Sequence, residues 1–153
     1  MASSGQQHPC REFALTAEII QPAQECIRAI EKMMLEMPQQ EIPVEHTFGP
    51  GFYARTIRIP ADTVLVGEEH ATEHIFLVSQ GEITLVTDGE PMRVTAGFQA
   101  VCKPGVKRAG YAHTEVVCTN VHITTETNLD ALRAQLIVAP SLPAPEKVKE
   151  IEL

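Results

Sequence analysis

The spacing of hydrophobic and polar positions changes along the chain, and its first clear pattern lies in residues 22–37. Apolar side chains recur there at steps of three and four residues, which places them on one face of an α-helix. They are Cys26, Ile27, Ile30, Met33, Met34 and Met37. Pro22 suits the first turn of such a helix, and Pro38 ends the pattern. The sequence therefore predicts an amphipathic helix whose Met-rich face packs against the core or another subunit.

Residues 41–125 show a different pattern, with short runs rich in Val, Ile, Thr and Phe. Gly, Pro and an Asp88-Gly89 hairpin signal separate these runs, which number about six to eight. The clearest runs span residues 74–79, 83–87, 92–95, 98–102 and 116–124. No helical pattern interrupts them, so the region is predicted to form an all-β sandwich or barrel rather than a parallel sheet.

The segment after the predicted barrel contains a short helical pattern and then a Pro-rich tail. Asn128 is a suitable N-cap for a helix in which three leucines share one face, namely Leu129, Leu132 and Leu136. Three prolines then favour an extended path, at Pro140, Pro143 and Pro145. The expected units are an N-terminal arm with the amphipathic helix, the β-barrel, and the short helix with its tail, over residues 1–40, 41–125 and 126–153.

Composition narrows the classes of partner. With 153 residues, the chain has the length of one domain with one core. Its 12 Lys and Arg against 20 Asp and Glu give a net charge of −8, which repels a phosphate backbone, so no nucleic-acid partner is expected. No apolar run reaches the ~18 residues of a membrane span, and the first residues lack a signal-peptide pattern. A cytoplasmic location is therefore expected, without membrane contact.

The 4 cysteines have neither the number nor the spacing of a disulfide scaffold, a zinc knuckle or a redox pair. Reduced thiols are therefore expected. Cys102 and Cys118 fall in predicted strands, where inert core thiols are the expected state. Lys103 is adjacent to Cys102 in sequence but belongs to the opposite strand face, so it gives this thiol no cationic neighbour.

Two of the 6 histidines stand out because they lie just before a predicted strand. If the segment is extended, Glu68, His70 and His74 share one face with Phe76 and Val78. A polar end followed by an apolar interior is typical of a ligand site in a β-barrel. Two imidazoles and one carboxylate are suitable ligands for divalent iron, manganese, nickel or zinc. Glu68, His70 and His74 are therefore candidate metal ligands.

Residues 62–113 resemble the small single-domain cupins, including uncharacterised cupins of bacterial and bacteriophage genomes. Cupins carry the motifs G-x5-H-x-H-x3-4-E-x6-G and G-x5-P-x-G-x2-H-x3-N, in which two His, the Glu and the later His bind metal. Anchoring on Gly81 aligns His74 with the motif's Glu, His70 with its second His and Glu68 with its first. The resemblance implies a mainly β fold, a double-sheet jelly-roll barrel, here with an N-terminal amphipathic helix and a short C-terminal helix.

In the same alignment Arg108 takes the place of the last metal-binding His. A guanidinium cannot act as a ligand, and its charge disfavours a nearby dication. Inside a barrel we expect Arg108 to face solvent or to pair with Glu68, and this pair would fill the space of an ion or hold an anionic ligand. His122 and His113 are candidate fourth ligands if the strands bend, although His122 also suits a structural role and His113 an exposed loop. The cofactor is therefore either absent or a divalent metal.

Two classes of function stay open at this point. The broken ligand set favours a structural or interaction module, whose helix and tail bind other subunits. The resemblance to bacteriophage cupins adds a virion or accessory role, with other virion proteins as partners and the virion as location. The alternative is a metal-dependent isomerase, dioxygenase or lyase, or a small-ligand binder. A homodimer or larger homo-oligomer is expected in either case, because open sheet edges commonly pair with a second copy.

Overall fold

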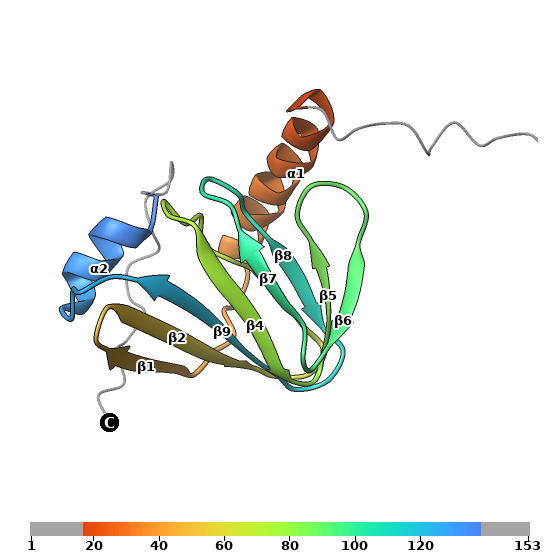
Figure 1. The fold of residues 1–153 in the computed structure, drawn as a ribbon. Coiled ribbons are helices and arrows are strands. Elements are labelled where there is room, and N and C mark those ends of the chain that lie inside the picture. The colour runs from red at the N-terminus through yellow and green to blue at the C-terminus, as the bar shows by residue number, and fades with distance from the viewer. Residues whose placement is uncertain (1–16, 139–153) are drawn as a thin grey trace, which may run out of the picture.

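The structure is a computed structural model that describes residues 17–138, in which two antiparallel β-sheets face each other (Figure 1). The described elements are α1 (Ala17–Leu35), β1 (Val44–Gly49), β2 (Phe52–Ile59), β3 (Thr63–Val66), β4 (His74–Gln80), β5 (Glu82–Val86), β6 (Met92–Thr95), β7 (Gln99–Cys102), β8 (Ala109–Ala112), β9 (Val116–Ile123) and α2 (Leu129–Leu136). The predicted N-terminal arm, Cys10 and the Pro-rich tail lie outside the described residues.

The two sheets have the strand orders β1-β2-β9-β4-β7 and β3-β8-β5-β6. Alternate side chains of each strand point between the sheets, where they form one apolar core. Its most buried members are Ile59, Val78, Ile83, Ala112 and Val116. The mainly β, double-sheet jelly roll with a helix before it and a short helix after it is therefore confirmed.

The runs singled out in the sequence correspond to β4, β5, β6, β7 and β9, whereas β1, β2, β3 and β8 were not singled out. β8 consists of Ala, Gly, Tyr and Ala, so it lacks the β-branched residues of a clear strand signal. β1 is an edge strand whose residues are mostly exposed, which removes the alternation of a half-buried strand. Asp88-Gly89 is not a two-residue hairpin, because Leu85 pairs with Met92 and leaves residues 86–91 between them.

Helix α1 begins before the predicted range of residues 22–37 and ends before its last residue. Only part of its predicted apolar face packs against the barrel. Ile27 is only 2% exposed, but Met33 and Met37 are 69% and 60% exposed. The periodicity therefore identified the helix but not the surface that contacts the sheets. Among residues 17–138, no helix has the length and apolar character required to cross a membrane.

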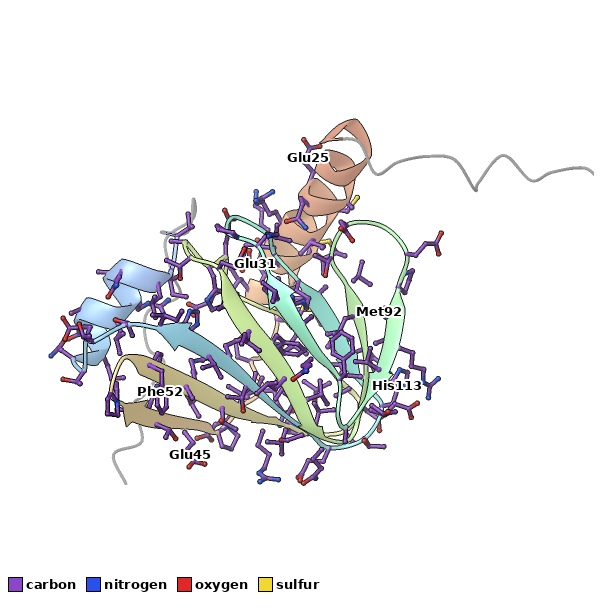
Figure 2. The ribbon with its side chains drawn as sticks, viewed as in Figure 1. Glu25, Glu31, Glu45, Phe52, Met92 and His113 are labelled. Carbon is purple, nitrogen blue, oxygen red and sulfur yellow. The ribbon has the colours of Figure 1, made fainter. Side chains whose placement is uncertain are left out.

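Polar contacts attach α1 to the barrel. Gln24 is 5% exposed and its Oε1 accepts a hydrogen bond from the backbone N–H of Lys107 at 2.8 Å. Its Nε2 donates to the carbonyls of Lys107, at 3.0 Å, and of Thr87. Lys107 also pairs with Glu31, with 2.7 Å between Nζ and Oε1, and Figure 2 shows Glu31 where α1 approaches the strands. These bonds fix the segment that leads into β8.

Helix α2 begins as predicted at Asn128, whose Oδ1 accepts a hydrogen bond from the N–H of Ala131 at 3.0 Å. Leu132 and Leu136 are buried against Tyr53 of β2. The end of the helix holds the loop between β3 and β4, because the carbonyl of Leu136 accepts from the N–H of Ala71 at 2.7 Å. In this way α2 helps to place the loop that carries one of the candidate ligands.

The turn between β4 and β5 allows a test of how closely two backbone segments of the barrel approach each other. Gly81 has φ +86°, and a Cβ at this position would lie 2.0 Å from the carbonyl oxygen of Glu115. We expect Gly81→Ala to lower the free energy of unfolding by about 3 kcal/mol or more, because backbone strain and a backbone clash add together. Gly97 has φ +96°, but a Cβ there would meet nothing within 4 Å, so Gly97→Ala should cost about 1 kcal/mol. Urea denaturation measures both, and equal losses would contradict the close approach at Gly81.

Candidate functional site

A cavity of about 320 Å³ lies between the two sheets. Several polar or ionisable side chains line it: Arg55, Glu68, His70, His74, Cys102, Arg108 and Asn120. Other lining residues are apolar and include Ile57, Ile59, Phe76, Leu85 and Phe98. The cavity therefore combines polar groups with apolar walls, which is the usual composition of a small-molecule site.

The register of the five-stranded sheet explains why particular polar side chains lie next to apolar ones in the wall of the cavity. Across neighbouring strands, Tyr53 is opposite His122, and His74 is opposite Cys102. Two residues further along, and therefore on the same face, the next row consists of Arg55, Asn120, Phe76 and Ala100. A row rich in histidine thus borders a row with one guanidinium, one amide and one phenyl ring.

Three histidines from separate parts of the sequence meet in this cavity region. Their ring centroids are 4.2 Å apart for His70 and His74, 4.7 Å for His74 and His122, and 5.0 Å for His70 and His122. One ring nitrogen of each lies within 4.8 Å of the others. His122 and His74 are only 2% and 6% exposed. This buried cluster is a group of side chains that could hold a metal ion.

Backbone contacts fix the positions of the three rings. The carbonyl of His70 accepts a hydrogen bond from the N–H of Gly105 at 2.8 Å, and His70 forms a β-bridge with Ile137. His74 Nδ1 donates to the carbonyl of Thr72 at 3.2 Å. His74 also forms a hydrogen bond with Cys102, which holds its ring from a second side. His122 lies in β9, within the sheet and between two neighbouring strands.

Two nitrogens in the cluster have unmet hydrogen-bonding capacity. Nδ1 of His70 and Nδ1 of His122 are buried and have no hydrogen-bond partner within the described residues. Buried polar atoms are nearly always paired, so such atoms indicate a missing ligand, ion or water. These two nitrogens, in a group of three imidazoles with ring nitrogens within 4.8 Å of one another, fit a divalent ion that prefers imidazole.

The environment of the cluster keeps two of its imidazoles neutral. Burial lowers the pKa of His70 to about 3, and positive charge at His74, His122, Arg55 and Arg108 adds to the effect. Burial also lowers the pKa of His122 to about 4, with further contributions from His74 and Arg55. At pH 7 both rings therefore carry a lone pair without having to lose a proton.

Cys102 has a different environment from the other thiol of the cavity. Its Sγ accepts a hydrogen bond from Nη2 of Arg108 at 2.6 Å. Burial raises the pKa of Cys102, but hydrogen bonds from His74 and Arg108, with the charge of Arg108, lower it overall. Burial instead raises the pKa of Cys118 to about 11. The expectation of an inert thiol therefore suits Cys118 but not Cys102, whose contact with Arg108 no local sequence pattern indicated.

The structure corrects the predicted role of Glu68. This residue lines the cavity, but its carboxylate pairs with Arg133 of α2 and does not belong to the three-histidine group. The predicted Arg108–Glu68 pair is wrong. Arg108 instead contacts Cys102 and lies over the ring of Phe76, with 4.6 Å from Cζ to the centroid. The group of candidate metal ligands that the fold brings together therefore contains His122 in place of Glu68. The carboxylate of Glu68 has its partner on α2 instead.

His113 is not brought to the cluster, although the sequence made it a candidate fourth ligand. Its Nε2 is 2.7 Å from Oγ1 of Thr84, and its ring contacts Tyr111 edge to face. Thr84 alternates along β5 with the buried Ile83 and Leu85, so this pair lies on the outer face of the four-stranded sheet. Figure 2 shows His113 at the end of the barrel away from α1.

Two other cavity residues, Arg55 and Asn120, were missed by sequence reasoning. Arg55 lies on β2, which was not recognised as a strand, so its inward direction could not be assigned. Asn120 has the same strand parity as Cys118 and His122 in β9. This shared parity could have indicated from the sequence that the amide of Asn120 and the imidazole of His122 point into the barrel together.

Comparison with known proteins gives a likeness of fold. No family model matches the chain, and no curated protein matches it. A cupin superfamily protein from Desulfitobacterium hafniense is 10% identical, over 57% of this chain and 82% of its own, with a TM-score of 0.49. A Cupin 2 conserved barrel domain protein from Salinispora arenicola is 17% identical, over 57% and 79%, with a TM-score of 0.48. A DMSP lyase from Ruegeria pomeroyi is 18% identical, over 57% and 49%, with a TM-score of 0.49. Identities this low say nothing about what the cavity binds.

Proposed function

We propose that the chain is a metal-dependent enzyme for a small molecule, with a divalent ion held by His70, His74 and His122. The observation that carries this proposal is the convergence of three imidazoles within 4.8 Å of one another beside a cavity. Three protein ligands leave coordination positions free for water or substrate, which is typical of catalytic metal sites rather than structural ones. The adjacent cavity, which combines polar groups with apolar walls, favours this function over a purely structural module.

The donor set restricts the metal. Imidazole suits zinc, iron, copper and nickel, whereas magnesium and calcium prefer oxygen ligands. When bound, such an ion supplies Lewis acidity and lowers the pKa of coordinated water. The surrounding residues hold the three rings in place, and apolar walls formed by Ile57, Phe76 and Leu85 limit the access of water.

Metal analysis tests the proposal directly. Protein purified without chelator, or stripped and then titrated with zinc, iron(II), nickel or manganese, should bind one ion per chain. The ion should also raise the thermal unfolding temperature, because binding to the native state at 100 times Kd adds about 2.7 kcal/mol to its stability. Less than a tenth of an equivalent with each of these ions would contradict the proposal.

A further inference from the structure

Two cationic groups in the cavity have no acidic partner. Arg55 and Arg108 both line it, and neither is among the ion pairs within 4.0 Å that residues 17–138 form. Of the other charged groups that line the cavity, Glu68 pairs with Arg133 and Lys103 with Glu73, while Asp88 belongs to none of these ion pairs. A partly desolvated guanidinium is stabilised by an anion. Two guanidinium groups and one carboxylate of the described lining are therefore outside ion pairs, which leaves the cavity locally cationic in a chain whose net charge is −8.

The surroundings of Arg55 add a second observation that points to a ligand. In the sheet register Arg55 is opposite Asn120, which is in turn opposite Phe76 on the next strand. Oδ1 of Asn120 is buried and has no hydrogen-bond partner among the described residues. An amide can turn either its oxygen or its NH₂ group toward a bound molecule. A guanidinium and an amide with unmet bonding capacity thus lie side by side.

Arg108 approaches from the segment before β8, which belongs to the other sheet. Its Nη2 donates to Sγ of Cys102, and its guanidinium lies over the ring of Phe76. These contacts hold the side chain in the cavity while engaging one of its five N–H donors. The two guanidinium groups therefore come from opposite sheets toward one space.

We propose that the cavity binds a small organic carboxylate, with its charged group on Arg55 and Asn120, near Arg108, and its apolar part against Ile57 and Phe76. The planar fork of a guanidinium matches the two oxygens of a carboxylate. The apolar walls favour a short aliphatic or single-ring tail over a bare inorganic anion, and about 320 Å³ is enough for such a molecule. This inference names the ligand class for the proposed small-molecule function, but the contacts that carry it do not involve the metal.

The probes are hexanoate and its neutral analogue hexanamide. Calorimetry measures the affinity of each for the full chain, once after chelator treatment and once after metal loading. Hexanoate should bind both forms, and hexanamide should bind at least tenfold more weakly. Arg55→Gln should weaken hexanoate at least tenfold, and Arg55→Lys should give an intermediate loss because it keeps the charge without the fork. Arg58→Gln is the matched control. Arg58 lies on the same strand but faces outward and pairs with Glu115 at 2.7 Å, so hexanoate affinity should not change.

Four results would overturn the inference. Three of them are equal affinity for hexanoate and hexanamide, unchanged hexanoate affinity in both Arg55 variants, and preferential binding of inorganic phosphate. Hexanoate that binds only the metal-loaded form and is insensitive to Arg55 would also overturn it, while leaving the metal proposal intact. Binding to the chelator-treated chain that depends on Arg55 would support it even if no metal were ever found.

Discussion

His122→Phe is expected to lower the affinity for a divalent ion by at least about 100-fold, because it removes one of three nitrogen ligands. Phenylalanine retains a planar ring at a position that is 2% exposed and stacks beside Tyr53, with centroids 6.2 Å apart. The exchange therefore removes coordination without leaving a cavity in the sheet. Metal content after loading, and titration of the stripped protein, would measure the loss.

His113→Phe is the matched control for that variant. It replaces a histidine with the same ring, but on the outer face of the four-stranded sheet, where Nε2 bonds to Thr84. Metal affinity should stay at the level of the unmodified protein. Equal loss in both variants would indicate a general effect on folding, and full retention by His122→Phe would exclude this histidine as a ligand.

The sequence placed two of the three clustered histidines together because they lie in one local segment, and gave the third, His122, only as a candidate fourth ligand. His70 precedes β4 and His74 is its first residue, so strand parity alone put them on one face. His122 joins them through the pairing of β9 with β4, in which Ile75 is opposite Val121. Such a long-range register cannot be read from local periodicity. The inward parity of β9 was visible, but not which strand would lie beside it.

The errors at Glu68 and Arg108 have a similar cause. Both residues line the cavity, so their approximate location was predicted correctly. Their partners were not, because Arg133 comes from α2 and Cys102 from β7. A motif alignment orders residues along one segment, whereas ion pairs and hydrogen bonds depend on how distant elements pack.

Helix α1 shows that local spacing along the sequence is also limited in predicting how an element packs in the fold. Its apolar period predicted a helix correctly, but the contact with the barrel involves the amide of Gln24 and the charged groups of Arg28 and Glu31. Buried polar groups require specific partners, and those partners fix the orientation of the helix. Hydrophobic spacing alone assigned Met33 and Met37 to packing against the core or another subunit, and they do not pack into the barrel, since both are exposed.

The second large effect is expected in the pH dependence of the metal-free protein. The folded-state pKa values of His70 and His122 are lowered to about 3 and about 4, against 6.5 for an ordinary histidine. Between these values and 6.5 the unfolded chain binds protons that the folded chain does not. The stability that these rings contribute is therefore fully present above pH 6.5 and is lost as the pH falls toward 4.

Each of the two rings should contribute about 1.4 kcal/mol per pH unit in that window, so the free energy of unfolding should fall by about 2.7 kcal/mol per unit. Urea denaturation in the presence of chelator, at several pH values between 7.5 and 4.5, would measure the slope. His122→Phe should reduce this slope by about half, because one of the two titrating rings is gone, whereas His113→Phe should leave it unchanged. A flat profile between pH 6.5 and 5 would mean that the rings are not held neutral by burial, and the geometry of the cluster would then have to be wrong.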